Sequence, residues 1–176
     1  VAVGYGAGSQ VTTGTDNTFI GGLAGDAITT SVSNTAVGRS SLSATTTGDE
    51  NSAVGRGSLS GNTTGENNVA LGFNALASNT TADNNTGIGS SAGASLTTGH
   101  SNVLLGSLAG DALNTGTDNV VLGFGSLGSD TKGNKSTALG RGTLVGQNFT
   151  SATDTYNTAV GYFAGNAVTT GTNNTL

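Results

Sequence analysis

The sequence predicts an all-β fold, a parallel β-solenoid (β-roll) of about ten 17-residue coils, with residues 1–176 forming a single repeat array. Three observations predict it: an Asn recurs at a constant interval, a Gly follows four residues later, and the residue before that Gly is always aliphatic. A fixed period of this kind is typical of repeat architectures in which each unit stacks on the next. Coils stacked about 4.8 Å apart would give a rod roughly 48 Å long.

The Asn of each unit is counted as position zero, and its column keeps register along the whole chain. The interval from Asn17 to Asn34 repeats at every step except the one from Ser136 to Asn157, which is four residues longer. Asn is common in turns, where its side chain can hydrogen-bond the backbone and can stack on the Asn of the next coil. We therefore expect one turn of each coil at this column: Asn17, Asn34, Asn51, Asn68, Asn85, Asn102, Asn119, Ser136, Asn157 and Asn174.

The strand of each coil precedes the Gly at position four, as in Thr35-Ala36-Val37-Gly38. Gly at positions four and fourteen suits corners that need positive φ or a close approach of the backbone. Alternation places positions one and three on one face of the strand and position two on the other. Both faces are largely apolar, which predicts burial on both sides. Because one small coil cannot supply both layers, we expect a parallel homo-oligomer, with a trimer favoured over an end-to-end filament.

Positions eight and eleven vary together. Where position eight is Gly, position eleven is aliphatic, and where position eight is Leu, position eleven is polar. Close packing explains the exchange, because one pocket per coil accepts one aliphatic side chain from either position. The predicted core pocket residues are Val11, Ile28, Leu42, Leu59, Leu76, Leu96, Leu113, Leu127, Leu144 and Val168.

Composition excludes several classes of protein. Gly, Thr, Asn and Ser dominate every unit, which disfavours helical repeats, and the absence of Pro disfavours collagen. The net charge of −5 disfavours nucleic acid as a partner. Without Cys there are no disulfides and no ordinary zinc sites, and no apolar run approaches the roughly 18 residues of a membrane helix. No cofactor is expected. The missing initial Met and the lack of a signal peptide suggest a fragment of a longer chain.

The unit N-T-A-V-G-x-x-S-L-x-x-x-T-T-G resembles repeats of bacteriophage tail fibres. Its core, as in Ala36-Val37-Gly38-Arg39-Ser40-Ser41 and Ala159-Val160-Gly161-Tyr162-Phe163-Ala164, is also similar to the head repeats of trimeric autotransporter adhesins. That resemblance implies a left-handed, trimeric parallel β-roll displayed outside the cell and binding host surfaces. The period here is longer than in those adhesin heads, so the turns can differ.

Two features are candidate contacts for a receptor or a glycan. Position five holds Arg or an aromatic residue in several coils, a combination suited to cation–π contact between chains or to stacking on sugar rings. The longer unit carries four extra residues between Val145 and Tyr156, and insertions in solenoids often carry binding. The candidate contact residues are Arg39, Arg56, Phe73, Phe124, Arg141, Phe149, Tyr156 and Tyr162.

Other motifs have simpler explanations. The Gly123–Gly128 segment matches G-x-G-x-x-G, but the repeat register accounts for it and a dinucleotide site would need a following helix. His100 has no partner for acid–base chemistry. Acids at positions fifteen and sixteen, such as Asp49, Glu66 and Asp83, fit turns and solubility better than calcium binding. We therefore predict no catalytic residues and no metal site.

The expected function is structural. The pattern favours an adhesive, non-enzymatic segment of an extracellular fibre, of a virion or a bacterial surface, which provides reach and contacts a host receptor or glycan. One alternative is an ice-binding solenoid, because a Thr-Thr pair recurs in most coils, as in Thr12-Thr13 and Thr63-Thr64. Only one of two adjacent Thr side chains can face outward, and Asn114 and Lys132 interrupt the column. The other alternative is a subunit of an extracellular filament whose copies stack end to end.

Overall fold

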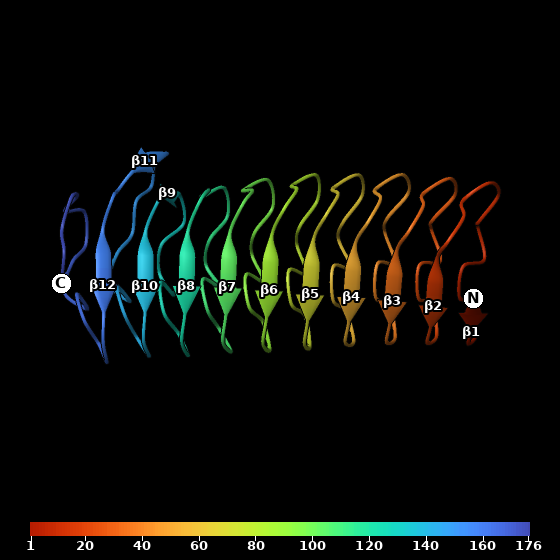
Figure 1. The fold of residues 1–176 in the computed structure, drawn as a ribbon, viewed down its shortest axis with the longest axis horizontal. Coiled ribbons are helices and arrows are strands. Elements are labelled where there is room, and N and C mark those ends of the chain that lie inside the picture. The colour runs from red at the N-terminus through yellow and green to blue at the C-terminus, as the bar shows by residue number, and fades with distance from the viewer.

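A computed structural model describes residues 1–176, and it is an all-β solenoid without helices (Figure 1). Ten strands form one sheet in chain order, and the predicted parallel β-solenoid is confirmed. No helix is present that could cross a lipid bilayer. The strands of this sheet are β1 (Ala2–Val3), β2 (Thr18–Ile20), β3 (Thr35–Val37), β4 (Ser52–Val54), β5 (Val69–Leu71), β6 (Thr86–Ile88), β7 (Val103–Leu105), β8 (Val120–Leu122), β10 (Thr137–Leu139) and β12 (Thr158–Val160).

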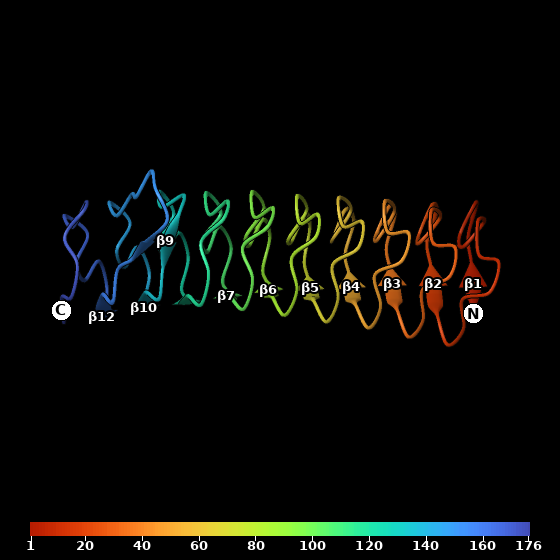
Figure 2. The same ribbon diagram turned by 90° about the horizontal axis from the view of Figure 1, so that it is seen from above.

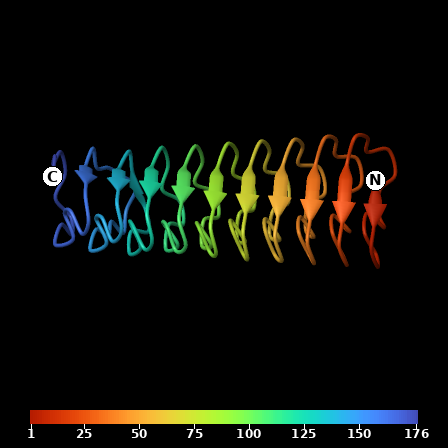
Figure 3. The ribbon, with the colours of Figure 1, turned by 60° about the horizontal axis from the view of Figure 1, so that its bottom comes forward.

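The register of the sheet follows the sequence period. Ala36 pairs with Ala53, and Ala53 pairs with Ala70, each exactly one repeat unit further along the chain. The longer unit does not disturb the stack, because Ala138 of β10 still pairs with Ala159 of β12. Instead, β11 (Thr153–Asp154) of the longer unit pairs with β9 (Gly133–Asn134) of the preceding coil, and the two form a small second sheet at one edge of the rod. Figures 2 and 3 show the strands side by side along the full length of the molecule.

A glycine corner ends every strand of the main sheet. Gly38 has φ +132°, and a Cβ added to it would lie 2.6 Å from the carbonyl carbon of Gly55 in the next coil. Any side chain there would force neighbouring coils apart. This close approach explains why position four is Gly in all ten coils, as the sequence predicted.

The Asn column lies inside the solenoid and links the coils. Asn68 is fully buried, and its Nδ2 donates to Oδ1 of Asn51 at 3.1 Å and to the carbonyl of Ala82 at 2.8 Å. Its own Oδ1 accepts the backbone N–H of Asn85 at 3.0 Å. Each Asn thus closes a turn of its own coil and bonds the coils on either side. The prediction that this column bonds the backbone and stacks on itself is confirmed.

The interior is a single cluster of apolar side chains along the axis. Position two contributes to it from Phe19 onward wherever it carries a side chain, position eight contributes where it is Leu, and position eleven contributes where it is aliphatic. In coils with Leu at position eight, the polar residue at position eleven is also buried: Asn62 donates from Nδ2 to the carbonyl of Gly65 at 2.9 Å, and Asn79 donates to Oδ1 of Asn62 at 3.1 Å. Both positions therefore line the core, although only one of them is aliphatic in each coil.

The outward face of the main sheet is uncovered in the single chain. Position two is buried, as at Ala36, but position three faces solvent, with Leu71 46% exposed and Leu122 50% exposed. Val120 at position one is also exposed. One chain therefore buries only the inner face of the strand, as expected for a coil that has no second layer of its own, and burial of the outer face by a partner chain stays a prediction. An apolar stripe is left along the rod.

Candidate functional site

Arginines lie beside aromatic rings at two places along the corner that follows each strand. The guanidinium of Arg56 lies 5.6 Å from the ring centre of Phe73 in the next coil. The guanidinium of Arg141 lies 5.5 Å from the ring centre of Phe124 and 5.8 Å from that of Tyr162, so rings of two neighbouring coils flank it. Contacts at these distances are attractive because the ring face is electronegative. Five of the predicted contact residues therefore form two surface clusters.

The cluster at Arg141 contains a shallow depression of about 130 Å³. The residues that line it are Phe124, Gly125, Arg141, Gly142, Val145 and Phe163. Phe163 packs edge-on against Tyr162, with 4.6 Å between the ring centres. The sequence reading missed Phe163, because position six otherwise holds Gly, Ser, Asn or Leu and showed no pattern. The signal that could have found it is the adjacent pair of aromatic residues, which occurs at no other corner.

The remaining predicted contact residues lie elsewhere. Arg39 has the same position in its coil but no ring beside it, because its neighbours in the column are Gly22 and Arg56. Phe149 is only 7% exposed, so it packs inward and cannot contact a receptor. This corrects the prediction, and the reason is that the insertion folds back onto the solenoid. Tyr156 is exposed, but it follows β11, which lies at the opposite edge of the rod from the corners (Figure 1).

An ion pair holds the insertion in place. Nζ of Lys135 lies 2.6 Å from Oδ2 of Asp154, and it also lies 5.3 Å from the ring centre of Tyr156. The hydrogen bond from Lys135 lowers the pKa of Asp154, and the same bond raises the pKa of Lys135. Both groups are exposed, so the pair adds little to global stability. It joins the insertion to the preceding coil beside the backbone pairing of β11 with β9.

A buried polar network lies beneath the insertion, where Ser136 replaces the Asn of the column. Gln147 donates from Nε2 to Oδ2 of Asp130 at 2.6 Å and to Oγ of Ser136 at 2.8 Å. Its Oε1 accepts from Nδ2 of Asn157 at 2.8 Å, and Oγ of Ser136 lies 2.7 Å from Oγ1 of Thr155. All five side chains are fully buried. Their partners are each other and the backbone, so the network is structural.

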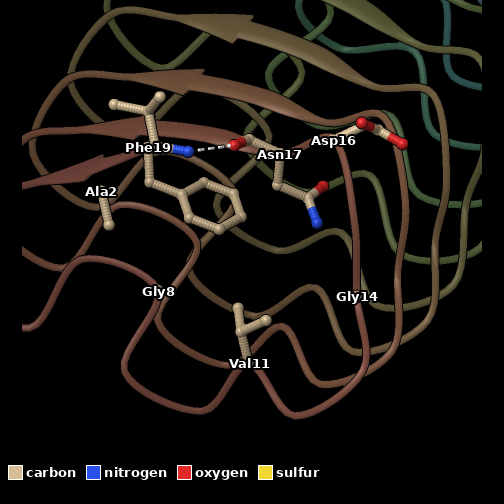
Figure 4. A pocket seen from close by; sticks show the side chains of 8 residues that line it. Ala2, Gly8, Val11, Gly14, Asp16, Asn17 and Phe19 are labelled. Atoms are coloured by element: carbon tan, nitrogen blue, oxygen red, sulfur yellow. Dashed lines mark hydrogen bonds between the residues drawn. The ribbon is translucent and has the colours of Figure 1, made fainter.

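In the two other hollows, no pair of side chains is arranged for acid–base catalysis. One, of about 210 Å³, opens at the axial end of the first coil, where the ring of Phe19 and the side chain of Val11 face the opening (Figure 4). It continues the apolar core. The other, of about 290 Å³, is a polar groove that includes Asp83 and His100. Nδ1 of His100 lies 3.3 Å from Oγ of Ser101, with no carboxylate to orient the ring.

Two of the acids at position fifteen accept hydrogen bonds from the backbone of the preceding coil. Oδ1 of Asp49 accepts the N–H of Val32 at 2.7 Å, and Oδ1 of Asp83 accepts the N–H of Glu66 at 2.8 Å. Nowhere do three or more His, Asp or Glu side chains converge on a point that could hold a metal ion. The glycines of Gly123–Gly128 lie in a corner of the solenoid, and no helix follows them.

The two Thr columns have different roles. Oγ1 of Thr63 donates to the carbonyl of Thr80 at 2.9 Å, and Oγ1 of Thr80 donates to that of Thr97 at 3.1 Å. The hydroxyls at position twelve therefore form hydrogen bonds between adjacent coils. Position thirteen makes no such bonds. Its hydroxyls form an outward rank of seven consecutive coils: Thr13, Thr30, Thr47, Thr64, Thr81, Thr98 and Thr115.

Comparison with known proteins gives no family for this chain. No protein-family model, no curated protein and no solved structure matches it.

Proposed function

We propose that the chain is a structural and adhesive segment of an extracellular fibre, a tail fibre of a bacteriophage or a surface adhesin of a bacterium, in which three copies pack side by side through the outward face of the main sheet. The segment would act by giving reach and by presenting its corners to a host surface. No catalytic step is part of this proposal.

The observation that carries the proposal is the apolar stripe on the outer face of the sheet. Position three is Val, Ile or Leu in every coil, and Leu71, Leu122 and Val160 are among the most exposed. Monomeric proteins rarely expose a continuous apolar patch of this extent. With the valines at position one, the stripe exposes on the order of 800 Å², which is what one partner contributes to a standard interface.

The spacing of the stripe favours a second copy of the same chain as the partner. Its apolar side chains recur once per coil, at the separation of adjacent parallel strands, about 4.8 Å. A partner surface with the same spacing can contact every one of these side chains. A second copy of this chain that lies parallel to the first has the same spacing, because it has the same coils. One such face per narrow rod suits three rods around a common axis. A trimer also agrees with the resemblance to adhesin heads.

The test is the mass of the chain in solution, by light scattering and native mass spectrometry. We expect about three times the 16.9 kDa of one chain. The double variant Leu71→Glu/Leu122→Glu places charges in the stripe and should be a monomer with an unchanged circular dichroism spectrum. The matched control, Thr64→Glu/Thr98→Glu, places the same charges on another exposed column and should remain a trimer. A monomeric wild type at about 100 μM, a concentration well above a micromolar Kd, would rule the proposal out.

The free rank of Thr hydroxyls supports one alternative function, ice binding. A regular outward array such as Thr47, Thr64 and Thr81 could order water, whereas the position-twelve rank is occupied by bonds between coils. An ice-recrystallisation assay separates the two functions. Inhibition by the wild type that is lost in Thr47→Lys/Thr64→Lys/Thr81→Lys would favour this alternative, and no inhibition would leave the fibre proposal in place.

A further inference from the structure

Arg141 is a cation without an anion. The one ion pair of the chain joins Lys135 to Asp154, and the side chain of Arg141 makes no hydrogen bond. Its neighbours on either side are the rings of Phe124 and Tyr162. An arginine that stacks on rings uses the flat face of its guanidinium and leaves the N–H groups at its edge free to donate. Those N–H groups match the two oxygens of a carboxylate.

The depression beside Arg141 provides an apolar surface next to that cation. Phe124 is 50% exposed, and Val145 and Phe163 complete the lining. A Cβ added to Gly125 would meet no atom within 4 Å, so the glycine leaves this side open. A Cβ on Gly142 would lie 2.5 Å from Cε1 of Phe163, so only glycine lets that ring seat where it does. The volume of about 130 Å³ suits one ring held partly in solvent.

We propose that this depression binds a carboxylate-bearing sugar ring of an acidic surface polysaccharide. The apolar C–H face of the pyranose would lie on Phe124 and Phe163, and its carboxylate would accept hydrogen bonds from Arg141. Charge supports this choice of ligand, because Arg141 is the one cation in the depression and has no acid to neutralise it. The inference rests on the adhesive part of the proposed function and names its ligand class.

The chain contains its own control at Arg56. This arginine also lies beside a ring, that of Phe73, at nearly the same distance. Its other neighbour in the column is Arg39, so no second ring completes a cluster, and no depression is present there. A Cβ on Gly57 would also contact Oδ1 of Asn74, a polar group where the other cluster has the ring of Phe163. An arginine beside a ring therefore occurs at two corners, and only the arginine that is flanked by two rings has a depression next to it.

The test is an NMR titration of the full chain, with the amide signals of Gly125 and Gly142 as reporters. Methyl β-D-glucuronide should shift them with a Kd on the order of 1 mM. Methyl β-D-glucoside, the same ring without the carboxylate, should bind at least ten-fold more weakly. N-acetylaspartate, a carboxylate without the ring, should bind equally weakly. Equal binding of either comparator would overturn the proposal, and so would the absence of shifts at these two glycines.

Variants separate the two parts of the site. Arg141→Gln should remove the preference for the glucuronide, and Phe124→Ala should weaken both sugars. Arg56→Gln should leave the binding unchanged. Ser90 and Ser107 occupy the column of Phe124 in other coils, so these substitutions keep the fold. If Arg141→Gln retains the preference, the carboxylate is recognised elsewhere and the assignment is wrong.

The outcomes also separate this proposal from the fibre proposal. A monomeric chain that still binds the glucuronide would overturn the trimer and leave the site intact. A trimer that binds none of the probes would overturn the site and leave the structural function intact.

Discussion

The ring of Phe19 fills the space that a side chain at Gly25 would need. A Cβ added to Gly25 would lie 2.5 Å from Cε1 and 2.6 Å from Cδ1 of that ring. Leu104 has the same relationship to two glycines, with 2.6 Å from its Cδ1 to a Cβ on Gly93 and 2.9 Å from its Cδ2 to one on Gly110. A large residue at position two therefore requires Gly at position eight nearby. Side chains at positions two, eight and eleven therefore compete for the same space in the core.

Gly25→Ala should destabilise the chain by about 3 kcal/mol, because it adds a clash with Phe19 to the strain of a left-handed residue. Gly125→Ala is the matched control. Its φ is +59°, close to the +56° of Gly25, but its added Cβ meets open space, so we expect about 1 kcal/mol. Urea unfolding measures both. In Phe19→Ala/Gly25→Ala the cost should fall at least about 1 kcal/mol below the sum of the single variants. Simple additivity would contradict the shared volume.

The exchange between positions eight and eleven can be moved from one coil to another. Leu42→Gly alone should cost about 3 kcal/mol, because it empties a fully buried site. Leu42→Gly/Thr45→Ile copies the pair Gly25 and Ile28 of the preceding coil and should recover at least about 1 kcal/mol of that loss. Part of the loss stays, since Oγ1 of Thr45 donates to the carbonyl of Asn62 at 3.1 Å. The urea midpoints of the two variants and the wild type measure this recovery. A double variant less stable than Leu42→Gly would refute the hypothesis that positions eight and eleven fill the same pocket.

The fold followed from the sequence because its signals repeat. One Gly at a corner is weak, but the same Gly in every coil, preceded each time by an aliphatic residue, leaves few architectures that satisfy it. The part that position two plays in the core could not be read the same way. Phe19 and Leu104 are isolated exceptions in a column of mostly Ala, and their meaning depends on glycines of neighbouring coils that only the coordinates place beside them.

The candidate site was predictable in part. The column of Arg39, Arg56 and Arg141 was visible, because all three occupy position five. Which of them would acquire a depression was not, since this depends on Phe163 and Val145, two residues without counterparts in other coils. The burial of Phe149 was hidden for a similar reason, because an insertion interrupts the period and no other coil shows how it folds.

Replacing one Asn of the column should lower the free energy of unfolding substantially. Asn68→Ala leaves the buried N–H of Asn85 without an acceptor and removes one of the two donors to the carbonyl of Ala82, and we expect a loss of about 3 kcal/mol. Asn68→Ser should recover little of it. Ser136 is tolerated at the same position only because Gln147 and Thr155 complete its hydrogen bonds.

The control for this variant is Asn67→Ser, one residue away on the surface. Ser33 and Ser101 occupy the equivalent position in other coils, both with positive φ, so the change should cost less than about 0.5 kcal/mol. Urea unfolding compares all three variants. Equal losses for Asn68→Ala and Asn67→Ser would mean that the column carries no special share of the stability.

The ion pair between Lys135 and Asp154, here called the clamp on the insertion, should break in acid. Because Lys135 lowers the pKa of Asp154, the stabilisation is present above the unfolded value of about 3.9 and is lost as pH falls through the lower, folded value. The raised pKa of Lys135 has the opposite sign, with stabilisation present below about 10.4 and lost as pH rises past the folded value. Between these limits the clamp should be constant.

The ring protons of Tyr156 report on the clamp, since Lys135 lies over that ring. Their NMR shifts should be flat from about pH 5 to 8 and should move toward free-tyrosine values below about pH 4. About 1 M salt should weaken the pair at neutral pH. Asp154→Asn should abolish the acid transition. A transition that persists in this variant would assign it to another group.

The direction of the hydrogen bonds between coils determines how the rod responds to pulling. These bonds, such as that from the N–H of Gly38 to the carbonyl of Ile20 at 2.7 Å, run along the long axis and join only adjacent coils. Tension between the two ends therefore loads the coil interfaces in series, and an end coil can peel away while the others stay intact. Each detached coil would release roughly 55 Å of extended chain. A single molecule held in an optical trap should thus lengthen in many small, nearly equal steps, one for each coil that detaches.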